Sequence, residues 1–213
     1  MINLPKLILA SQSPRRAEIL TAVGWEFEKQ TADVDESEFP DEKPENYVQR
    51  LAKAKAETIA LKHENALVLG ADTIVVINGK IIGKPKDFAD ARRMLRMLSG
   101  NWHEVLTGVA LVMKEKEKRR KEKEENNSQF AICIPQLIVG LQRTRVKFAE
   151  LSDAEVKFLV EKGEPLDKAG AYAVQAQAAL FIEQIEGDYW NVVGLPINLV
   201  YEQLKTLLKK KAE

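Results

Sequence analysis

The chain has 213 residues, and its 32 lysines and arginines balance 32 aspartates and glutamates, so the formal net charge is zero. Such a chain does not hold a polynucleotide through general basicity, so we expect no nucleic-acid partner and only local basic chemistry. One cysteine, Cys133, excludes an intramolecular disulfide framework and a multi-cysteine zinc site. The length allows one domain, or two small lobes that share a cleft.

No stretch predicts an export signal or a membrane-spanning helix. The apolar start, residues 4–10, is too short for the apolar region of a signal peptide and has no basic segment before it. The most apolar later window, 130–141, contains Pro135 and is shorter than the ~18 residues that a spanning helix needs. We therefore expect a soluble, cytoplasmic protein without a membrane partner.

Short apolar runs alternate with helical patterns along the chain, which predicts an α/β or α+β fold rather than a helix bundle or a β-sandwich. A strand is expected at 6–10, and Ser13 and Pro14 then provide a hydroxyl N-cap and a first helical residue. The next expected elements are a strand at 25–31, an acidic loop at 33–38 and a long amphipathic helix from Pro44 to about residue 63.

Two β-rich runs, 66–70 and 73–77, flank Asp72, and Asn78-Gly79 predicts a two-residue hairpin turn. Asp87 is expected to cap a helix, and a strand is expected at 105–113. Residues 114–125 are twelve consecutive charged residues, seven basic and five acidic. We expect the insertion 114–128 to be a flexible loop or a hairpin extension, with an RNA-binding loop as the alternative.

The last third contains three further expected elements. Ser152 and Glu155 have the spacing of a capping box before a helix that ends at Gly163. Residues 181–189 resemble a hairpin around Gly187, and 196–211 are expected to form the last helix, with lysines at its C-terminus.

Residues 11–16 combine hydroxyls and guanidiniums where a strand runs into a helix. Free backbone N–H groups at a helix start attract anions, so this segment is a candidate phosphate cradle. Its polar side chains are Ser11, Ser13, Arg15 and Arg16. The alternative is a plain N-cap with solvated arginines.

Lys84 follows Gly83 in a segment that superficially resembles a P-loop. The glycine spacing is one residue short, and Pro85 stands where a P-loop has a serine or threonine for magnesium, so a Walker-type site is excluded. Lys84 would either reach a phosphate as a point charge or lie in an ordinary turn.

Asp72 lies inside an apolar strand pattern, where an ionised carboxylate is costly to bury without a partner. A ligand, a cation or a strand end explains such a position. Asp33, Asp35 and Glu36 form an acidic loop that would either bind a divalent cation or only favour solubility.

Lys53 and Lys55 are two residues apart on one predicted helix, so only one of them can face a cleft, and nothing local chooses between them. Gln175 would either read a base with its amide or lie as a polar residue at a strand end. His63 and His103 have no metal-ligand spacing, and we expect both to be structural or exposed.

Seven motifs between residues 7 and 196 together resemble the Maf family of nucleoside triphosphate pyrophosphatases, also called septum-formation inhibitor proteins. They are Leu9-Ala-Ser11-Gln-Ser13-Pro-Arg15-Arg16, Arg50-Leu51-Ala52 with Lys55, Gly70-Ala-Asp72-Thr73, Gly83-Lys84-Pro85, Thr107-Gly108-Val109, Asp167-Lys168-Ala-Gly170-Ala-Tyr172 with Gln175, and Val193-Gly194-Leu195-Pro196. Only the charged insertion lies outside this pattern.

The resemblance implies an inosine-triphosphatase-like α/β fold: an elongated mixed sheet with two lobes around a central cleft, as one domain over residues 1–213. It implies hydrolysis of a nucleoside triphosphate to the monophosphate and pyrophosphate with a divalent cation, Mg²⁺, Mn²⁺ or Co²⁺, and a homodimer. The Ala-Asp-Thr and Gly-Ala-Tyr-x-x-Gln forms resemble the dTTP and UTP branch. The alternatives are a 7-methyl-GTP pyrophosphatase and a non-catalytic nucleotide-binding protein that regulates division.

The resemblance implies that Asp72 accepts a proton, that Arg15, Thr73 and Gln175 select the substrate, and that Glu36, Lys55 and Lys84 are further polar residues of the cleft. We expect these last three to be catalytic, and Glu36 and Asp72 to hold the metal. We expect Ser11, Ser13 and Arg16, from the candidate phosphate cradle, to bind the substrate with Arg15, Thr73 and Gln175.

Overall fold

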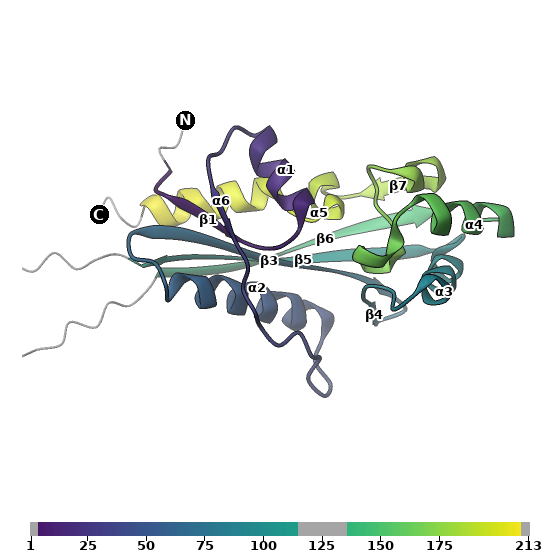
Figure 1. Ribbon diagram of the computed structural model, residues 1–213, viewed down its shortest axis with the longest axis horizontal. Coiled ribbons are helices and arrows are strands. Elements are labelled where there is room, and N and C mark those ends of the chain that lie inside the picture. The colour runs from purple at the N-terminus through teal and green to yellow at the C-terminus, as the bar shows by residue number, and fades with distance from the viewer. Residues whose placement is uncertain (1–3, 115–135, 210–213) are drawn as a thin grey trace, which may run out of the picture.

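The structure is a computed structural model that describes residues 4–114 and 136–209 (Figure 1). Its elements in chain order are β1 (Leu7–Ala10), α1 (Pro14–Ala22), β2 (Glu28–Gln30), α2 (Pro44–Ala60), β3 (Ala66–Ile77), β4 (Lys80–Ile82), α3 (Phe88–Leu98), β5 (Trp102–Lys114), β6 (Gln136–Phe148), α4 (Asp153–Lys162), η1 (Pro165–Asp167), η2 (Ala169–Ala171), η3 (Gln177–Phe181), β7 (Ile182–Glu186), α5 (Tyr189–Val193) and α6 (Ile197–Lys209).

One mixed seven-stranded sheet forms the centre of an elongated molecule (Figure 1). The strand order is β2-β1-β3-β5-β6-β7, and β4 pairs with the end of β3. Strand β1 runs parallel to both β2 and β3, whereas the other pairs are antiparallel. The α/β fold with an elongated mixed sheet is therefore confirmed.

Helix α2 covers one face of the sheet, and α1, α5 and α6 lie on the other (Figure 1). Two glycines allow α2 to pack directly on the strand backbones. A Cβ added to Gly70 of β3 would lie 2.2 Å from the carbonyl oxygen of Ala52, and one added to Gly108 of β5 would lie 2.2 Å from that of Val48. This close approach fixes α2 relative to β3.

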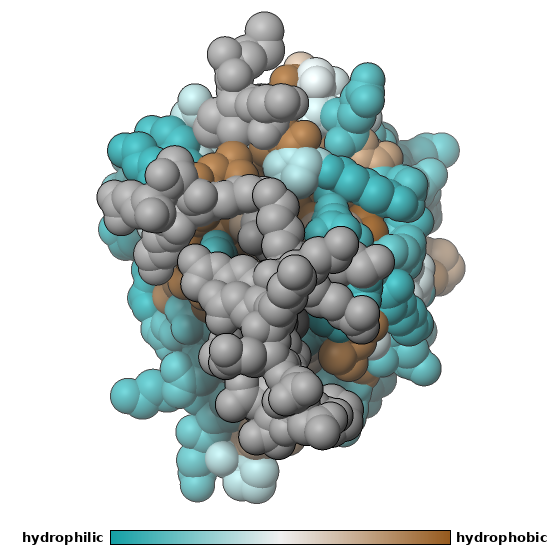
Figure 2. Space-filling view, turned by 90° about the vertical axis from the view of Figure 1, so that its left-hand side faces the viewer, coloured by the Kyte–Doolittle hydropathy of each residue, from teal (hydrophilic) through white to brown (hydrophobic). Residues whose placement is uncertain are grey.

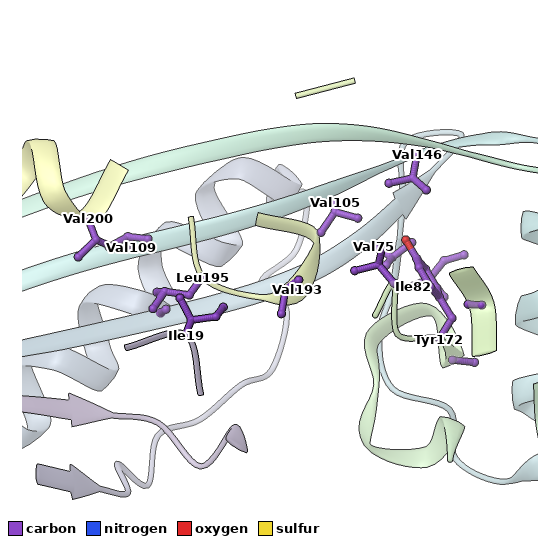
Figure 3. Close-up of a cluster of buried hydrophobic side chains, with 14 of the residues drawn as sticks. Ile19, Val75, Ile82, Val105, Val109, Val146, Tyr172, Val193, Leu195 and Val200 are labelled. Atoms are coloured by element: carbon purple, nitrogen blue, oxygen red, sulfur yellow. The ribbon is translucent and has the colours of Figure 1, made fainter. Parts of the chain in front are cut away.

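The largest cluster of buried apolar side chains extends along the face that carries α1, α5 and α6. It runs from Val109 and Val200, past Ile19 and Leu195, to Val75 and Tyr172 at the other end (Figure 3). Two smaller clusters lie under α2. Burial of about 25 cal/mol per Å² of apolar surface makes such clusters the main stabilising contribution to the fold.

Several local predictions are confirmed. The side chain of Asp87 accepts a hydrogen bond from the N–H of Asp90, Ser152 and Glu155 form both halves of a capping box, and Ile77 pairs with Lys80 across the Asn78-Gly79 turn. These predictions depend only on neighbouring residues, which explains their success.

Other local predictions are wrong. Residues 66–77 form one strand rather than two runs, because β3 pairs with β5 from Ala66 to Val76 and this ladder does not depend on side chains. The hairpin around Gly187 is absent, since β7 pairs with β6 instead, and Asp188 caps α5 by accepting from the N–H of Trp190. The second strand is only Glu28–Gln30.

The charged insertion 114–128 and Cys133 lie outside the described residues, except for Lys114 at the end of β5. Figure 2 views the left-hand end of Figure 1, where hydrophilic side chains form much of the described surface. In the described part of the chain, no helix has the length and apolarity needed to cross a bilayer.

Candidate active site

All ten residues that the sequence nominated as site residues line one cavity of about 780 Å³. Segments far apart in the chain meet there: the end of β1 with the start of α1, the middle of β3, α2, the turn after β4, and residues 167–175. A cavity of this size is typical of small-molecule sites.

Asp72, Lys55 and Glu36 form an ion-paired group in this cavity. The Nζ atom of Lys55 lies 2.7 Å from Oδ1 of Asp72 and 2.6 Å from Oε1 of Glu36. The side chains of Lys55 and Asp72 are only 12% and 13% exposed, whereas that of Glu36 is half exposed. Lys53 instead pairs with Glu57 at the surface, so Lys55 is the one of these two lysines that faces the cavity.

The pKa values of the two carboxylates in this group are shifted in opposite directions. Burial raises the pKa of Asp72 above its usual value, although the charges of Lys55 and Arg16 oppose that shift. Burial also opposes ionisation of Glu36, but the hydrogen bond and charge of Lys55, with the charge of Lys84, lower its pKa overall. Burial therefore dominates at Asp72, and the cationic neighbours dominate at Glu36.

Arg16 is buried and holds three parts of the site together. Its guanidinium donates to the carbonyl oxygen of Gly194 at 2.9 Å, to Oγ of Ser11 at 2.9 Å and to Oγ1 of Thr73 at 3.0 Å. Burial lowers its pKa, while the charge of Asp72 raises it. The solvated-arginine alternative is therefore wrong for Arg16, which orients the hydroxyls of Ser11 and Thr73.

Ser13 occupies the N-cap position of α1, but its hydroxyl makes no capping hydrogen bond, so that prediction is wrong. Its N–H donates to Oγ of Ser11 at 3.2 Å. Arg15 reaches across the cavity to Asp167, with Nη1 lying 3.3 Å from Oδ2. Asp167 also pairs with Lys168 at 2.6 Å.

Lys84 and Gln175 are exposed on the cavity wall, and neither has a hydrogen bond or an ion pair with any of the described residues. The polar ends of these two side chains are therefore available to a ligand.

Helix α2 also holds the acidic loop that carries Glu36. The hydroxyl of Tyr47 donates to the carbonyl oxygen of Glu36 at 2.8 Å, and Arg50 donates to that of Ser37 at 2.9 Å. Arg50 also pairs with Glu42 at 2.6 Å, and its guanidinium lies over the ring of Phe39, just after the loop. These contacts place the Glu36 carboxylate near Lys55.

The family model described as "Maf-like protein" matches residues 6–207. The chain belongs to the Maf family. It is 47% identical over 201 residues to a dTTP/UTP pyrophosphatase of Geotalea uraniireducens, with 94% of each chain covered. A protein of the same name from Koribacter versatilis is 46% identical over 200 residues, with 93% of each covered.

A third relative, also named dTTP/UTP pyrophosphatase, comes from Symbiobacterium thermophilum and is 44% identical over 201 residues, covering 94% of this chain and 93% of its own. Six of the seven Maf motifs contribute residues to the cavity, and Thr107 of the remaining motif lies in hydrogen-bond contact with Thr73, which lines it. Within the described ranges, no group of three or more His, Cys, Asp or Glu side chains is placed to hold a metal.

The donor chemistry of this Maf site nevertheless fits a hard divalent cation. Glu36 and Asp72 both lie within hydrogen-bond distance of one cationic atom, Nζ of Lys55. Mg²⁺ is commonly bound by one or two carboxylates and completed by water and substrate phosphates. Two carboxylates are therefore a sufficient protein contribution.

Sequence reasoning gave no role to five residues that shape this Maf site. Tyr47 and Arg50 were detectable, because residues three apart share one face of a helix and here face the acidic loop. Asp167, Lys168 and Tyr172 carried no local signal beyond their motif, since their position depends on the packing of η1 and η2.

Proposed function

We propose that this chain hydrolyses dTTP and UTP to the monophosphate and pyrophosphate. The observation that carries the proposal is Asp72, a buried carboxylate of raised pKa, in a cavity that is lined by five cationic and four anionic side chains. The similarity to relatives named dTTP/UTP pyrophosphatase supports the substrate class. The cavity has these charged lining residues: Arg15, Arg16, Lys55, Lys84, Lys168, Asp33, Glu36, Asp72 and Asp167.

The triphosphate would lie against the start of α1 and the free cation of Lys84. Backbone N–H groups at a helix start and basic side chains are the usual partners of phosphate oxygens. Arg15 would add a second cation by exchanging its long contacts with Asp167 for the substrate. Arg16 would act through Ser11 and Thr73, whose hydroxyls it orients.

In the reaction, Asp72 accepts a proton from the water whose oxygen forms a bond to the α-phosphorus. The bond from that phosphorus to the oxygen bridging the α- and β-phosphates breaks, and pyrophosphate leaves with its electron pair. Lys55 orients the Asp72 carboxylate by its 2.7 Å contact. Lys84 balances charge that develops on the leaving group.

Glu36 and Asp72 would hold the divalent cation, Mg²⁺, Mn²⁺ or Co²⁺. When bound, such a cation neutralises phosphate charge and orients the triphosphate. Gln175, whose amide both donates and accepts, would pair with the edge of uracil or thymine. The homodimer expected from the family resemblance stays a prediction.

A nucleotide panel with pyrophosphate detection tests this function. We expect dTTP and UTP to be hydrolysed well ahead of 7-methyl-GTP, and Lys55→Ala to lose most of this activity. Lys53→Ala is the matched control, because Lys53 lies two residues away on the same helix and pairs with Glu57 at the surface.

Preference for 7-methyl-GTP would overturn the substrate assignment. Tight binding of dTTP without pyrophosphate release would favour the non-catalytic alternative.

A further inference from the structure

The cavity wall formed by residues 168–175 has a strained backbone. Gly170 and Ala171 are consecutive residues with positive φ, 69° and 66°. Ala171 is 1% exposed, and it is the only buried non-glycine residue with positive φ among the described residues. An alanine in this conformation costs roughly 1–2 kcal/mol, so surrounding contacts must hold it there.

Contacts from β3, from β5 and from the turn after β4 hold this wall. The N–H of Gly170 donates to the carbonyl oxygen of Gly83, at the turn after β4, at 3.0 Å. A Cβ on Gly170 would lie 2.9 Å from the side chain of Val75 on β3, so the turn packs tightly on the sheet. Tyr172 lies beside Val75 in the buried cluster (Figure 3).

The third contact is a buried hydrogen bond between Tyr172 and His103 of β5. The phenol oxygen lies 2.7 Å from Nε2 of His103. The two rings meet edge to face with centroids 5.4 Å apart, and Phe148 contacts Tyr172 in the same way at 5.0 Å. The cluster fixes both the ring and the hydroxyl of Tyr172.

His103 serves no other polar group in the described chain. It is 2% exposed, and its Nδ1 has no hydrogen-bond partner there. Burial lowers its pKa to about 4, so the imidazole is neutral at physiological pH. A half-satisfied buried imidazole costs about 1–3 kcal/mol, and an apolar residue would avoid that cost. The hydrogen bond to Tyr172 is therefore the one contact that explains a histidine at this buried position.

We propose that His103 is a positioning residue for the nucleobase: through Tyr172 it holds the strained wall 170–175 so that Gln175 faces the substrate. The proposal rests on the proposed function, in which Gln175 reads the base. Gln175 lies three residues beyond Tyr172 on the same wall, and its side chain has no partner among the described residues, so its position depends on the backbone that Tyr172 and the buried Val174 anchor.

Two single variants and their double variant test this role. Tyr172→Phe and His103→Leu each leave one buried polar group without its partner. We expect roughly a fivefold rise in KM for dTTP with kcat nearly unchanged, together with lower discrimination against dCTP. The conservative variant His103→Gln places an amide near the position of Nε2, so its KM for dTTP is expected to stay close to that of the wild type.

The double variant His103→Leu/Tyr172→Phe separates positioning from stability. Replacing both partners by apolar groups removes the unpaired polar atom, so Tm is expected to recover. A positioning role predicts that KM and discrimination stay altered. Recovery of KM together with Tm would overturn the proposal, as would single variants with unchanged discrimination.

His63→Leu is the matched control, because the other histidine of the chain bonds to Gln30, whose side chain does not line the cavity. The variants are measured with the nucleotide that the wild type prefers, and by Kd if the wild type binds without hydrolysis. A preference other than dTTP or UTP therefore refutes the proposed substrate, while an unchanged KM or Kd in the variants refutes the role of His103.

Discussion

Two parts of the cavity lining differ in their secondary structure: the floor, which carries Asp72 and Lys55, and the wall formed by residues 168–175. Asp72 and Lys55 at the floor lie on a twelve-residue strand and a seventeen-residue helix, pressed together at Gly70. The wall 168–175 is irregular, has Ala171 at φ 66° and is held by side-chain packing and single hydrogen bonds such as that of Tyr172 with His103. Ladder and helix hydrogen bonds do not depend on side chains, so the floor is rigid. The wall depends on individual side chains and is easier to alter.

Asp72→Asn tests the floor with the largest expected effect. The amide cannot accept the proton, so pyrophosphate release should fall at least about a hundredfold, the scale of general base catalysis. Circular dichroism should stay unchanged, because β3 keeps its ladder with β5. Asp90→Asn is the control, because Asp90 lies outside the cavity and pairs with Arg93 on α3, and it should keep full activity. Retained turnover in Asp72→Asn would remove Asp72 from its role.

Gly70→Ala tests the contact between β3 and α2. The new Cβ would meet backbone atoms of α2 that cannot move alone, so we expect a loss of about 3 kcal/mol in the free energy of unfolding, at the upper end for overpacking. Urea denaturation measures it. Gly83→Ala, where a Cβ meets open space, is the stability control and should be neutral. Equal stability of the two variants would contradict the close packing.

Acid should weaken the support of the wall. The pKa of His103 is lowered by burial to about 4 from 6.5, so below pH 6.5 the unfolded chain binds a proton that the folded chain does not. The stability that this group contributes is complete above pH 6.5 and is lost as pH falls towards 4, on the order of 3 kcal/mol.

Urea denaturation at pH 7 and pH 4.5 measures this loss. His103→Leu should lose clearly less stability than the wild type over that range. Equal losses in the two proteins would show that other groups cause the pH dependence.

Arg50→Ala has the smallest expected effect. It tests the acidic loop 33–38, which carries Glu36 to the floor of the cavity. Without the clamp on Ser37 and Glu42, the acidic loop should hold Glu36 less well. We expect roughly a fivefold rise in the Mg²⁺ concentration for half-maximal activity, equivalent to one hydrogen bond. Titration of Mg²⁺ measures it, with Lys53→Ala as the control. An unchanged Mg²⁺ requirement would argue against Glu36 as a ligand.

Much of the site could be predicted from the sequence, because its residues occur in short motifs with their own chemistry. Asp72 was conspicuous as a charge inside an apolar strand, and it indeed lies buried against Lys55. The choice between Lys53 and Lys55 could not be made, since it depends on how α2 sits on β3. The contacts of Asp167 with Arg15 and of His103 with Tyr172 could not be predicted either, because they depend on how η1 and η2 pack on the rest of the fold.

The sequence by itself determined the family, the order of most elements and ten of the residues that line the cavity, because caps, turns and motifs act over a few neighbouring residues. Only the tertiary structure decided which partners those residues have. Arg16 joins Ser11, Thr73 and Gly194, segments up to 178 residues apart, and Tyr172 meets His103 across 69 residues. Such contacts follow from strand pairing and core packing, whose energies depend on the whole chain at once.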